Sequence, residues 1–222
     1  GSIVRSERKD KMEDIDSFAV VRIVDDDVGV RESYKFLIES DGWLVKTYCS
    51  AEDFLEHDNP TVPGCVVLDV RMPGLTGLEL QNRLNSFVYK IPVIFISAHA
   101  DIEMVVKAMQ NGALDFLPKP IKDESLLVAI EKAVRLDHTR REKTKEKSEV
   151  NQNWSSLSPR EQETARLIAE GLLNKQIADR LGITERTVQV HRANVFSKFG
   201  VRNAVQFAQK LMLIKSDDVN KA

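Results

Sequence analysis

Four polar elements of this sequence could together bind a cation and a phosphoryl group. The aspartates Asp25 to Asp27 follow one apolar run, Asp69 follows a second, and Ser97 and Lys119 follow two more. Clustered carboxylates repel one another and stay ionised when a cation compensates them, and Mg²⁺ (or Mn²⁺) is a hard ion that carboxylate oxygens bind. With the ion and Lys119 neutralising the incoming charge, the Asp69 carboxylate could attack phosphorus and form an acyl phosphate.

The apolar runs before these residues must be strands of one parallel sheet if the polar side chains are to meet. Apolar runs alternate with helical patterns, which predicts a doubly wound α/β fold, and five such pairs fit the flavodoxin-like order 2-1-3-4-5. The carboxyl ends of parallel strands share one edge of a sheet, so this fold would gather the polar elements there. Taken singly, each polar residue also has an ordinary explanation as a turn or capping residue. The expected strands span 19–25, 43–48, 65–69, 91–97 and 114–118, and the expected helices span 28–41, 51–55, 77–86, 102–111 and a segment from 123 onward.

Charge divides the 222-residue chain into two parts. Residues 17–122 carry ten Lys/Arg against fifteen Asp/Glu, whereas residues 154–215 carry ten against five. An acidic half favours cations as partners, and a basic half favours nucleic acid. The connecting residues 137–153 are charged and lack Gly and Pro. They fit either a solvated helix that frays into a linker or one continuous helix joining the two halves.

Other features of the sequence argue against a membrane or secreted protein. No apolar run approaches the roughly 18–20 residues that span a membrane. The start, Gly1-Ser2, resembles the remainder of a cleaved tag, and residues 3–16 are charged without the apolar core of a signal peptide. These features predict a cytoplasmic protein with no membrane partner. The cysteines Cys49 and Cys65 form no metal-type pair, and we expect both to be buried.

The C-terminal third has the pattern of a helix-turn-helix. Ser158 and Glu161 form a capping box at the start of one helix, Asn174 is expected to cap a second, and Thr184 is expected to cap a long third helix after a turn at Gly182. In this motif the helix after the turn enters the major groove of DNA. A small helical module that binds protein would show a similar pattern.

Four segments resemble, in order, the signature segments of the receiver domain of response regulators, especially the FixJ-like group. They are VRIVDDD, VVLDVRMPGLTG, IFISAHAD and DFLPKP, and the resemblance covers essentially all of 19–135. It implies that Asp69 is the phosphoacceptor. It also implies that the metal is held by Asp25, Asp26, Asp69 and the backbone carbonyl of Arg71.

The same resemblance implies roles for residues around the phosphoryl group. Ser97 and Lys119 would contact its oxygens, and Ser97 and Phe116 would act as the conformational switch. Phe116 could instead be an ordinary core residue. The Lys119–Pro120 bond resembles one that is cis in receivers.

Residues 157–201, beginning LSPREQETARLIAEGLLNKQIADRLGITERTVQVHR, resemble the LuxR-type helix-turn-helix. Carried over by position, Gln189, Val190 and Ala193 would face base edges. Gln can read adenine through two hydrogen bonds, but many relatives have Lys at position 189, so no sequence preference can be carried over with it. Further contacts to phosphates or base edges would come from Lys175, Thr184, Thr187, His191, Arg192 and Lys198. His191 could equally be a half-buried histidine with a partner inside the protein.

These inferences predict a receiver domain over 17–135, a charged helical linker over 136–153 and a LuxR-type DNA-binding domain over 154–215. The resemblance implies a transcriptional regulator that a sensor histidine kinase phosphorylates and that binds double-stranded promoter DNA as a homodimer formed on phosphorylation. RNA polymerase is a further expected partner. No enzyme activity is expected beyond self-phosphorylation and autodephosphorylation at Asp69. The alternatives are a Mg²⁺-dependent phosphohydrolase, for which the sequence offers no general acid, and a helical unit that binds protein or RNA.

Overall fold

The computed structural model describes residues 18–98 and 101–215, and its contacts divide the chain into two compact units, 1–141 and 142–222. We call these the α/β unit and the helical unit. The N-terminal stretch from which a cytoplasmic location was predicted, and His99 beside the predicted metal site, lie outside the described residues.

The α/β unit contains a five-stranded parallel sheet in the order β2-β1-β3-β4-β5, which confirms the predicted topology. Its strands are β1 (Val20–Val24), β2 (Leu44–Tyr48), β3 (Gly64–Asp69), β4 (Val93–Ser97) and β5 (Asp115–Pro118). Its helices are α2 (Val28–Ser40), α3 (Ala51–His57), α4 (Gly77–Leu84), α5 (Ile102–Gln110) and the first part of α6 (Asp123–Ser155).

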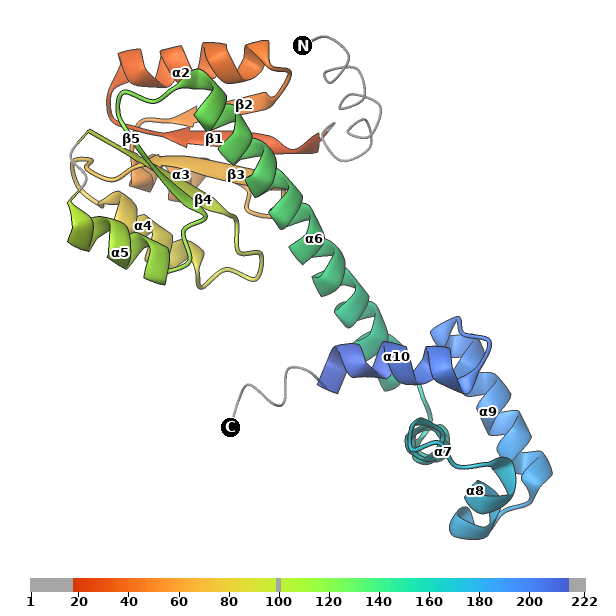
Figure 1. The fold of residues 1–222 in the computed structure, drawn as a ribbon. Helices are drawn as coiled ribbons and strands as arrows, with labels where there is room; N and C mark the ends of the chain where they lie inside the picture. Colours follow the sequence, from red (N-terminus) through yellow and green to blue (C-terminus); the bar gives the residue numbers. More distant parts are fainter. Residues whose placement is uncertain (1–17, 99–100, 216–222) are drawn as a thin grey trace. The chain divides into compact units, whose positions relative to one another are not determined.

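Helices cover both faces of this sheet (Figure 1). The face packed against α3, α4 and α5 holds the core around Leu68 and Phe95, and the face packed against α2 and α6 holds the core around Ile23 and Ile94. Strands β1, β3 and β4 are therefore buried on both sides, which explains why their sequences are mainly apolar, apart from Arg22 and the polar residues at their ends, rather than alternating.

The helical unit consists of the end of α6 followed by α7 (Pro159–Ala169), α8 (Asn174–Leu181), α9 (Glu185–Phe199) and α10 (Ala204–Lys215). Its core includes Val188, Val195 and Phe199 of α9. The turn between α8 and α9 contains Gly182 at φ +65°, a left-handed conformation that closes α8 and that side chains with a Cβ rarely adopt.

One predicted cap in this unit is wrong. Asn174 is the first residue of α8, and Leu173 occupies the N-cap position. The reason is that Gln176 does the capping, because its side-chain oxygen accepts a hydrogen bond from the Leu173 backbone N–H at 2.8 Å. The Asn174 side chain instead accepts a hydrogen bond from Arg192 at 3.3 Å.

The charged connection is one continuous helix, because α6 runs for 33 residues from Asp123 to Ser155. It stays attached to the α/β unit beyond residue 135, where its apolar stripe ends. Asp137 is buried and accepts a hydrogen bond from the Gly64 backbone N–H at 2.8 Å. Arg141 pairs with Asp137 at 2.7 Å and donates to the backbone carbonyls of Pro60 and Thr61.

The prediction for the cysteines holds for Cys65, which is buried in β3, and is wrong for Cys49, which is exposed. Cys49 follows β2, an edge strand of the sheet, and its backbone N–H donates to the Asp53 side chain at 2.9 Å. In the described part of the chain, no helix is both long enough and apolar enough to cross a membrane.

Candidate functional site

Three ionisable side chains meet at the carboxyl ends of the parallel strands. Asp25 follows β1, Asp69 ends β3 and Lys119 follows β5. The Lys119 ammonium donates to Asp25 Oδ2 and to Asp69 Oδ1, each at 2.8 Å. We call these three residues the acidic edge. The strand register thus brings together groups that are as far as 94 positions apart in the sequence.

Burial controls the charges at the acidic edge. Asp25 is 1% exposed and Asp69 is 6% exposed. Burial raises the pKa of Asp69; the hydrogen bond and charge of Lys119 act against this rise, and the charge of Asp25 adds to it. Burial alone would lower the pKa of Lys119, but the hydrogen bonds to the two carboxylates reverse the direction and raise it. One ammonium therefore faces two carboxylates, and a negative charge remains in excess.

The backbone around the acidic edge is held in place by short hydrogen bonds. Asp69 Oδ2 accepts from the Arg71 N–H at 2.7 Å, and Asp25 Oδ1 accepts from the Asp27 N–H at 2.9 Å. The Lys119 N–H donates to the Ser97 carbonyl at 2.8 Å, and the Lys119–Pro120 bond is cis, as the resemblance implied. The loops that follow β1 and β3 are thus fixed by hydrogen bonds to the Asp25 and Asp69 side chains that they carry.

The backbone of Asp69 also depends on a close approach by Gly77, the first residue of α4. A Cβ at position 77 would lie 2.2 Å from the Asp69 carbonyl oxygen, which is nearer than any side chain could pack. Gly77, the second glycine of the RMPGLTG segment, is therefore required for α4 to begin directly behind Asp69.

The other predicted residues surround the acidic edge with different exposures. Asp26 and Asp27 are exposed, and Asp27 caps α2 by accepting from the backbone N–H groups of Gly29 and Val30, which agrees with leaving it out of the ligand set. Ser97 is 2% exposed at the end of β4. Phe116 is half-buried, with its ring centre 6.0 Å from that of Phe95.

Sequence reasoning missed two residues of α2 that lie beside the acidic edge. Arg31 donates to the Asp25 backbone carbonyl at 2.6 Å. Burial raises the pKa of Tyr34, and the charges of Lys119, Asp25 and Asp69 also act on its hydroxyl. Helical spacing was the available signal, because residue 31 lies one turn after Asp27.

The residues of the acidic edge fit a magnesium ion by their chemistry. Among the described residues, no three side chains of His, Cys, Asp or Glu form a ready metal cluster. Mg²⁺ does not require one, since it keeps several waters and commonly binds one or two protein carboxylates. The two buried carboxylates of Asp25 and Asp69 share one ammonium, and the exposed Asp26 lies beside them. Together they form such a donor set, in which carboxylates outnumber the ammonium.

In the helical unit, the predicted DNA-contacting residues differ in how free their side chains are. Gln189, Val190 and Ala193 are exposed on α9, and Lys175 is exposed on α8. The exposed Arg186 lies one turn before Val190 on this side of α9 and was missed.

Four of the five remaining predicted contacts, all except His191, have partners inside the unit. Thr184 caps α9 and its hydroxyl lies 2.9 Å from that of Thr187. Arg192 bonds to Asn174 and stacks over the Phe196 ring at 5.1 Å. His191 is half-buried. Lys198 donates to Glu161 at 2.8 Å.

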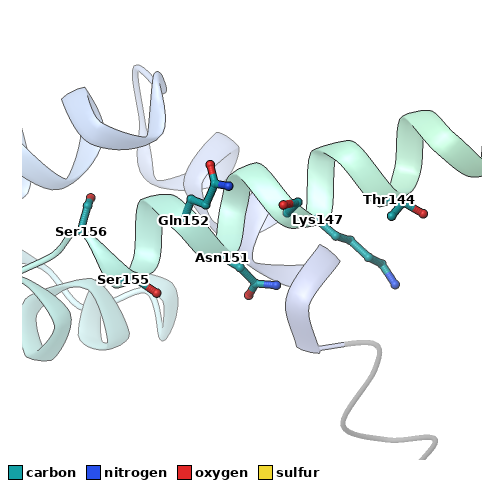
Figure 2. A pocket seen from close by; sticks show the side chains of 7 residues that line it. Thr144, Lys147, Asn151, Gln152, Ser155 and Ser156 are labelled. Atoms are coloured by element: carbon teal, nitrogen blue, oxygen red, sulfur yellow. The ribbon is translucent and has the colours of Figure 1, made fainter. Parts of the chain in front are cut away.

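A polar hollow lies along α6 in the helical unit (Figure 2). Its lining comes from one helix face and the residue after it, and a single charged side chain, Lys147, is among the lining residues. Because no second element contributes to the hollow, it adds no candidate site. The lining residues are Thr144, Lys147, Ser148, Asn151, Gln152, Ser155 and Ser156.

Two family models match the chain. Residues 21–131 match the response regulator receiver domain, and residues 155–211 match the bacterial regulatory proteins of the luxR family. The first match contains the whole acidic edge, and the second contains the helix-turn-helix formed by α8 and α9.

Curated relatives resemble the chain over most of its length. Nodulation protein W of Bradyrhizobium diazoefficiens is 43% identical over 185 residues, which cover 83% of this chain and 82% of the relative. The response regulator protein TodT of Pseudomonas putida is 44% identical over 186 residues, covering 84% and 82%. The transcriptional regulatory protein FixJ of Azorhizobium caulinodans is 39% identical over 193 residues, covering 87% and 92%.

Solved structures of similar proteins also cover both units. The response regulator StyR has a TM-score of 0.81 at 45% identity and covers 88% of this chain and 99% of its own. Full-length FixJ from B. japonicum has a TM-score of 0.53 at 34% identity, with 89% and 98% covered.

Proposed function

Because this chain belongs to the response regulators of two-component systems that carry a luxR-family DNA-binding domain, we propose that it accepts a phosphoryl group on Asp69 from a sensor histidine kinase. The modification controls how the helical unit occupies double-stranded promoter DNA. The observation that carries this proposal is the acidic edge, where a buried Asp69 shares the single Lys119 ammonium with Asp25.

The proposed transfer is a displacement at phosphorus. An oxygen of the Asp69 carboxylate forms the new bond while the bond from phosphorus to the donor nitrogen breaks, and that electron pair leaves with the donor imidazole. The incoming phosphoryl group adds negative charge at a place where negative charge is already in excess. Lys119, at 2.8 Å from Asp69, can shift from a carboxylate to a phosphoryl oxygen, and the Ser97 hydroxyl is proposed to donate to another.

The charge balance also requires a cation, and we assign Mg²⁺ (or Mn²⁺) to Asp25, Asp26, Asp69 and the Arg71 carbonyl. When bound, the ion neutralises charge on the oxygens around phosphorus. The chain's own contribution is to hold Asp69 still. The Arg71 N–H on Oδ2 and the Gly77 backbone behind the Asp69 carbonyl fix this side chain and its strand end.

The proposed output is DNA binding through α9. Exposed Gln189, Val190 and Ala193 are available to base edges, and the exposed cations Lys175 and Arg186 are available to phosphates. Few cations per copy mean that one helical unit binds weakly and in a salt-dependent manner. A homodimer formed on phosphorylation, spanning two half-sites, would combine two such contacts. The proposed trigger for dimer formation is Ser97 moving toward the phosphoryl group and Phe116 filling the space it leaves.

The phosphoacceptor is tested by incubating the chain with acetyl phosphate and Mg²⁺ and locating the added mass by peptide mass spectrometry. We expect one phosphoryl group on Asp69 and none on Asp69→Asn. Asp27→Asn is the matched control, because Asn also caps helices, and it should be modified like the wild type. Modification of the wild type at another residue, or no modification at all, would refute the assignment.

The output is tested with duplex DNA selected from a random pool by the phosphorylated chain. Beryllofluoride with Mg²⁺ should increase the affinity of the wild type and the size of its complex, and should leave Asp69→Asn unchanged. Turnover of phosphate esters by the unphosphorylated chain would favour the phosphohydrolase alternative instead.

A further inference from the structure

We propose that Lys198 positions the DNA-reading helix α9 through Glu161 and does not itself contact a DNA phosphate; this inference rests on the proposed DNA-binding function. The Lys198 ammonium, in the last turn of α9, donates to Glu161 Oε2 at 2.8 Å and to the Ser156 carbonyl at 2.9 Å. A single side chain therefore joins α9 to the start of α7 and to the residue that follows α6.

The direction of Lys198 on α9 separates it from the base-reading face. An α-helix turns about 100° per residue, so nine residues place Lys198 about 180° around the axis from Gln189 and about 13 Å further along it. By the same count it is about 140° from Ala193 and about 80° from Val190, the nearest of the three base-facing residues. It lies instead beside the stripe formed by Val188, Val195 and Phe199, which packs into the core. Lys198 thus projects from the flank of α9 that meets α7.

Glu161 is prepared to receive this lysine. It is 6% exposed, and its carboxylate also accepts a hydrogen bond from the Ser158 backbone N–H at 2.8 Å. In return, the Ser158 hydroxyl accepts from the Glu161 N–H, which completes the capping box of α7. The hydrogen bond from Lys198 is the main cause that lowers the pKa of Glu161 to about 2. The Glu161 carboxylate is therefore ionised, and the two hydrogen bonds of the capping box hold it in place for Lys198.

Lys198 also stabilises the C-terminal end of α6, through its hydrogen bond to the Ser156 carbonyl. The last carbonyls of a helix lack partners within the helix and carry partial negative charge, which a cation stabilises. Lys198 supplies such a cation at the C-terminal end of α6. The orientation of α9 against both α7 and the end of α6 consequently depends on one ammonium.

The two possible roles of Lys198 predict opposite effects for its partner. If Lys198 held a phosphate, replacing Glu161 with Gln would free the lysine and maintain or raise DNA affinity. If Lys198 positions α9, the same replacement breaks the contact and lowers affinity. We expect a loss of about tenfold in affinity, which corresponds to about 1.4 kcal/mol, for Glu161→Gln or Lys198→Met.

The experiment measures affinity for the selected duplex across a series of salt concentrations. A phosphate-contacting lysine contributes about 0.9 to the slope of log affinity against log salt. Lys198→Met should weaken binding with no change in this slope, and the double variant Lys198→Met/Glu161→Gln should lose little more affinity than Lys198→Met alone, because both substitutions break the same contact. Lys175→Met, at an exposed lysine of α8, is the matched comparison and should lower the slope by about 0.9. Lys198→Arg keeps the ion pair and should bind like the wild type.

Circular dichroism and thermal unfolding establish that each variant is folded at the assay temperature, and a non-additive loss in the double variant excludes two independent destabilising effects as the cause. The inference is overturned if Lys198→Met lowers the slope by about 0.9 while Glu161→Gln keeps or raises affinity. It is equally overturned if the losses of the two single variants add in the double variant. A wild-type chain with no affinity for any duplex would instead overturn the proposed DNA-binding function, and this inference with it.

Discussion

Lys119 in the α/β unit and Lys198 in the helical unit make contacts of the same geometry with opposite electrostatic results. Lys119 reaches two oxygens at 2.8 Å each, and Lys198 reaches two at 2.8 and 2.9 Å. Both acceptors of Lys119 are carboxylates, whereas Lys198 faces one carboxylate and one backbone carbonyl. The pKa of Asp69 is raised by its burial, and that of Glu161 is lowered to about 2 by its lysine.

The charge balance around a lysine, rather than its distances, distinguishes a reactive site from a structural ion pair. At Lys198 one positive charge meets one negative charge, and the pair is complete. At Lys119 one positive charge meets two negative charges, which leaves room for a cation and for chemistry that changes the charge. Buried carboxylates with a raised pKa beside a second charged group are typical of functional sites.

Arg22, in the interior of the α/β unit, is a third cation that pairs with a carboxylate. It is fully buried in β1, and its Nε lies 2.8 Å from both carboxylate oxygens of Asp58. The Tyr48 hydroxyl donates to the same carboxylate at 2.7 Å. The remaining N–H groups of Arg22 reach the backbone carbonyls of Val20, Asn59, Val62 and Pro63. Every charge here is matched, so this network should affect stability alone.

The largest effect is therefore expected for Arg22→Met. Removing the guanidinium leaves the Asp58 carboxylate buried without a counter-charge, which should lower the free energy of unfolding of the α/β unit by about 3–5 kcal/mol. Urea unfolding followed by the fluorescence of the buried Trp43, in a Trp154→Phe background, measures it.

A second substitution distinguishes lost charge balance from lost packing. Adding Asp58→Asn to Arg22→Met removes the unpaired charge and keeps an acceptor for the Tyr48 hydroxyl, so it should recover a large part of the stability. If Arg22→Met alone costs under 1 kcal/mol, the network is not the structural element proposed here.

A smaller and selective effect is expected from Mg²⁺. At a concentration of a hundred times its Kd, an ion that binds only the folded state adds about 2.7 kcal/mol to the free energy of unfolding. The α/β unit should gain this stability and the helical unit should not. Calorimetry with Mg²⁺ or with a chelator measures both transitions in one chain. The gain should disappear in Asp25→Asn/Asp69→Asn and persist in Asp27→Asn; an equal gain in the helical unit would remove the distinction between the two lysines.

Sequence patterns predicted the sheet and the acidic edge well because both follow from local rules. Apolar strands followed by Asp69, Ser97 or Lys119 needed only the rule that parallel strands share a carboxyl edge. The charges of Arg22 and Arg141 gave no such signal. Arg22 lies within an apolar strand, and its partners are mainly loop carbonyls about forty residues away, which no periodicity reveals. Arg141 looked like one of many charges in a solvated helix, yet it binds carbonyls of the same loop.

Sequence reasoning assigned Lys198 to DNA for a related reason. A cation on a helix predicted to read DNA suggests a phosphate contact, and only the three-dimensional packing of α7 against α9 supplies the competing carboxylate of Glu161. Cys49 and Asn174 were misassigned because each lies at the boundary of an element, where one residue of displacement changes exposure or capping. Long-range contacts between residues at strand ends follow from periodicity, whereas the ion pairs of charges inside a strand or along a helix do not.

The smallest effect concerns the acid stability of the Lys198–Glu161 pair. Lys198 from α9 and the backbone N–H of Ser158 both favour the ionised Glu161, so its folded-state pKa of about 2 lies below the unfolded value near 4.5. The unfolded state then binds the proton more readily between these values, and stability falls as the pH decreases through this window. Glu161→Gln should flatten this pH dependence for the helical unit between about pH 4.5 and pH 2, without altering it above pH 5. Thermal unfolding followed by Trp154 fluorescence across this range, in a Trp43→Phe background, measures the difference. An identical pH dependence in wild type and variant would mean that Lys198 does not hold the Glu161 carboxylate. Lys198 could then not be contrasted with Lys119 as the lysine of a structural ion pair.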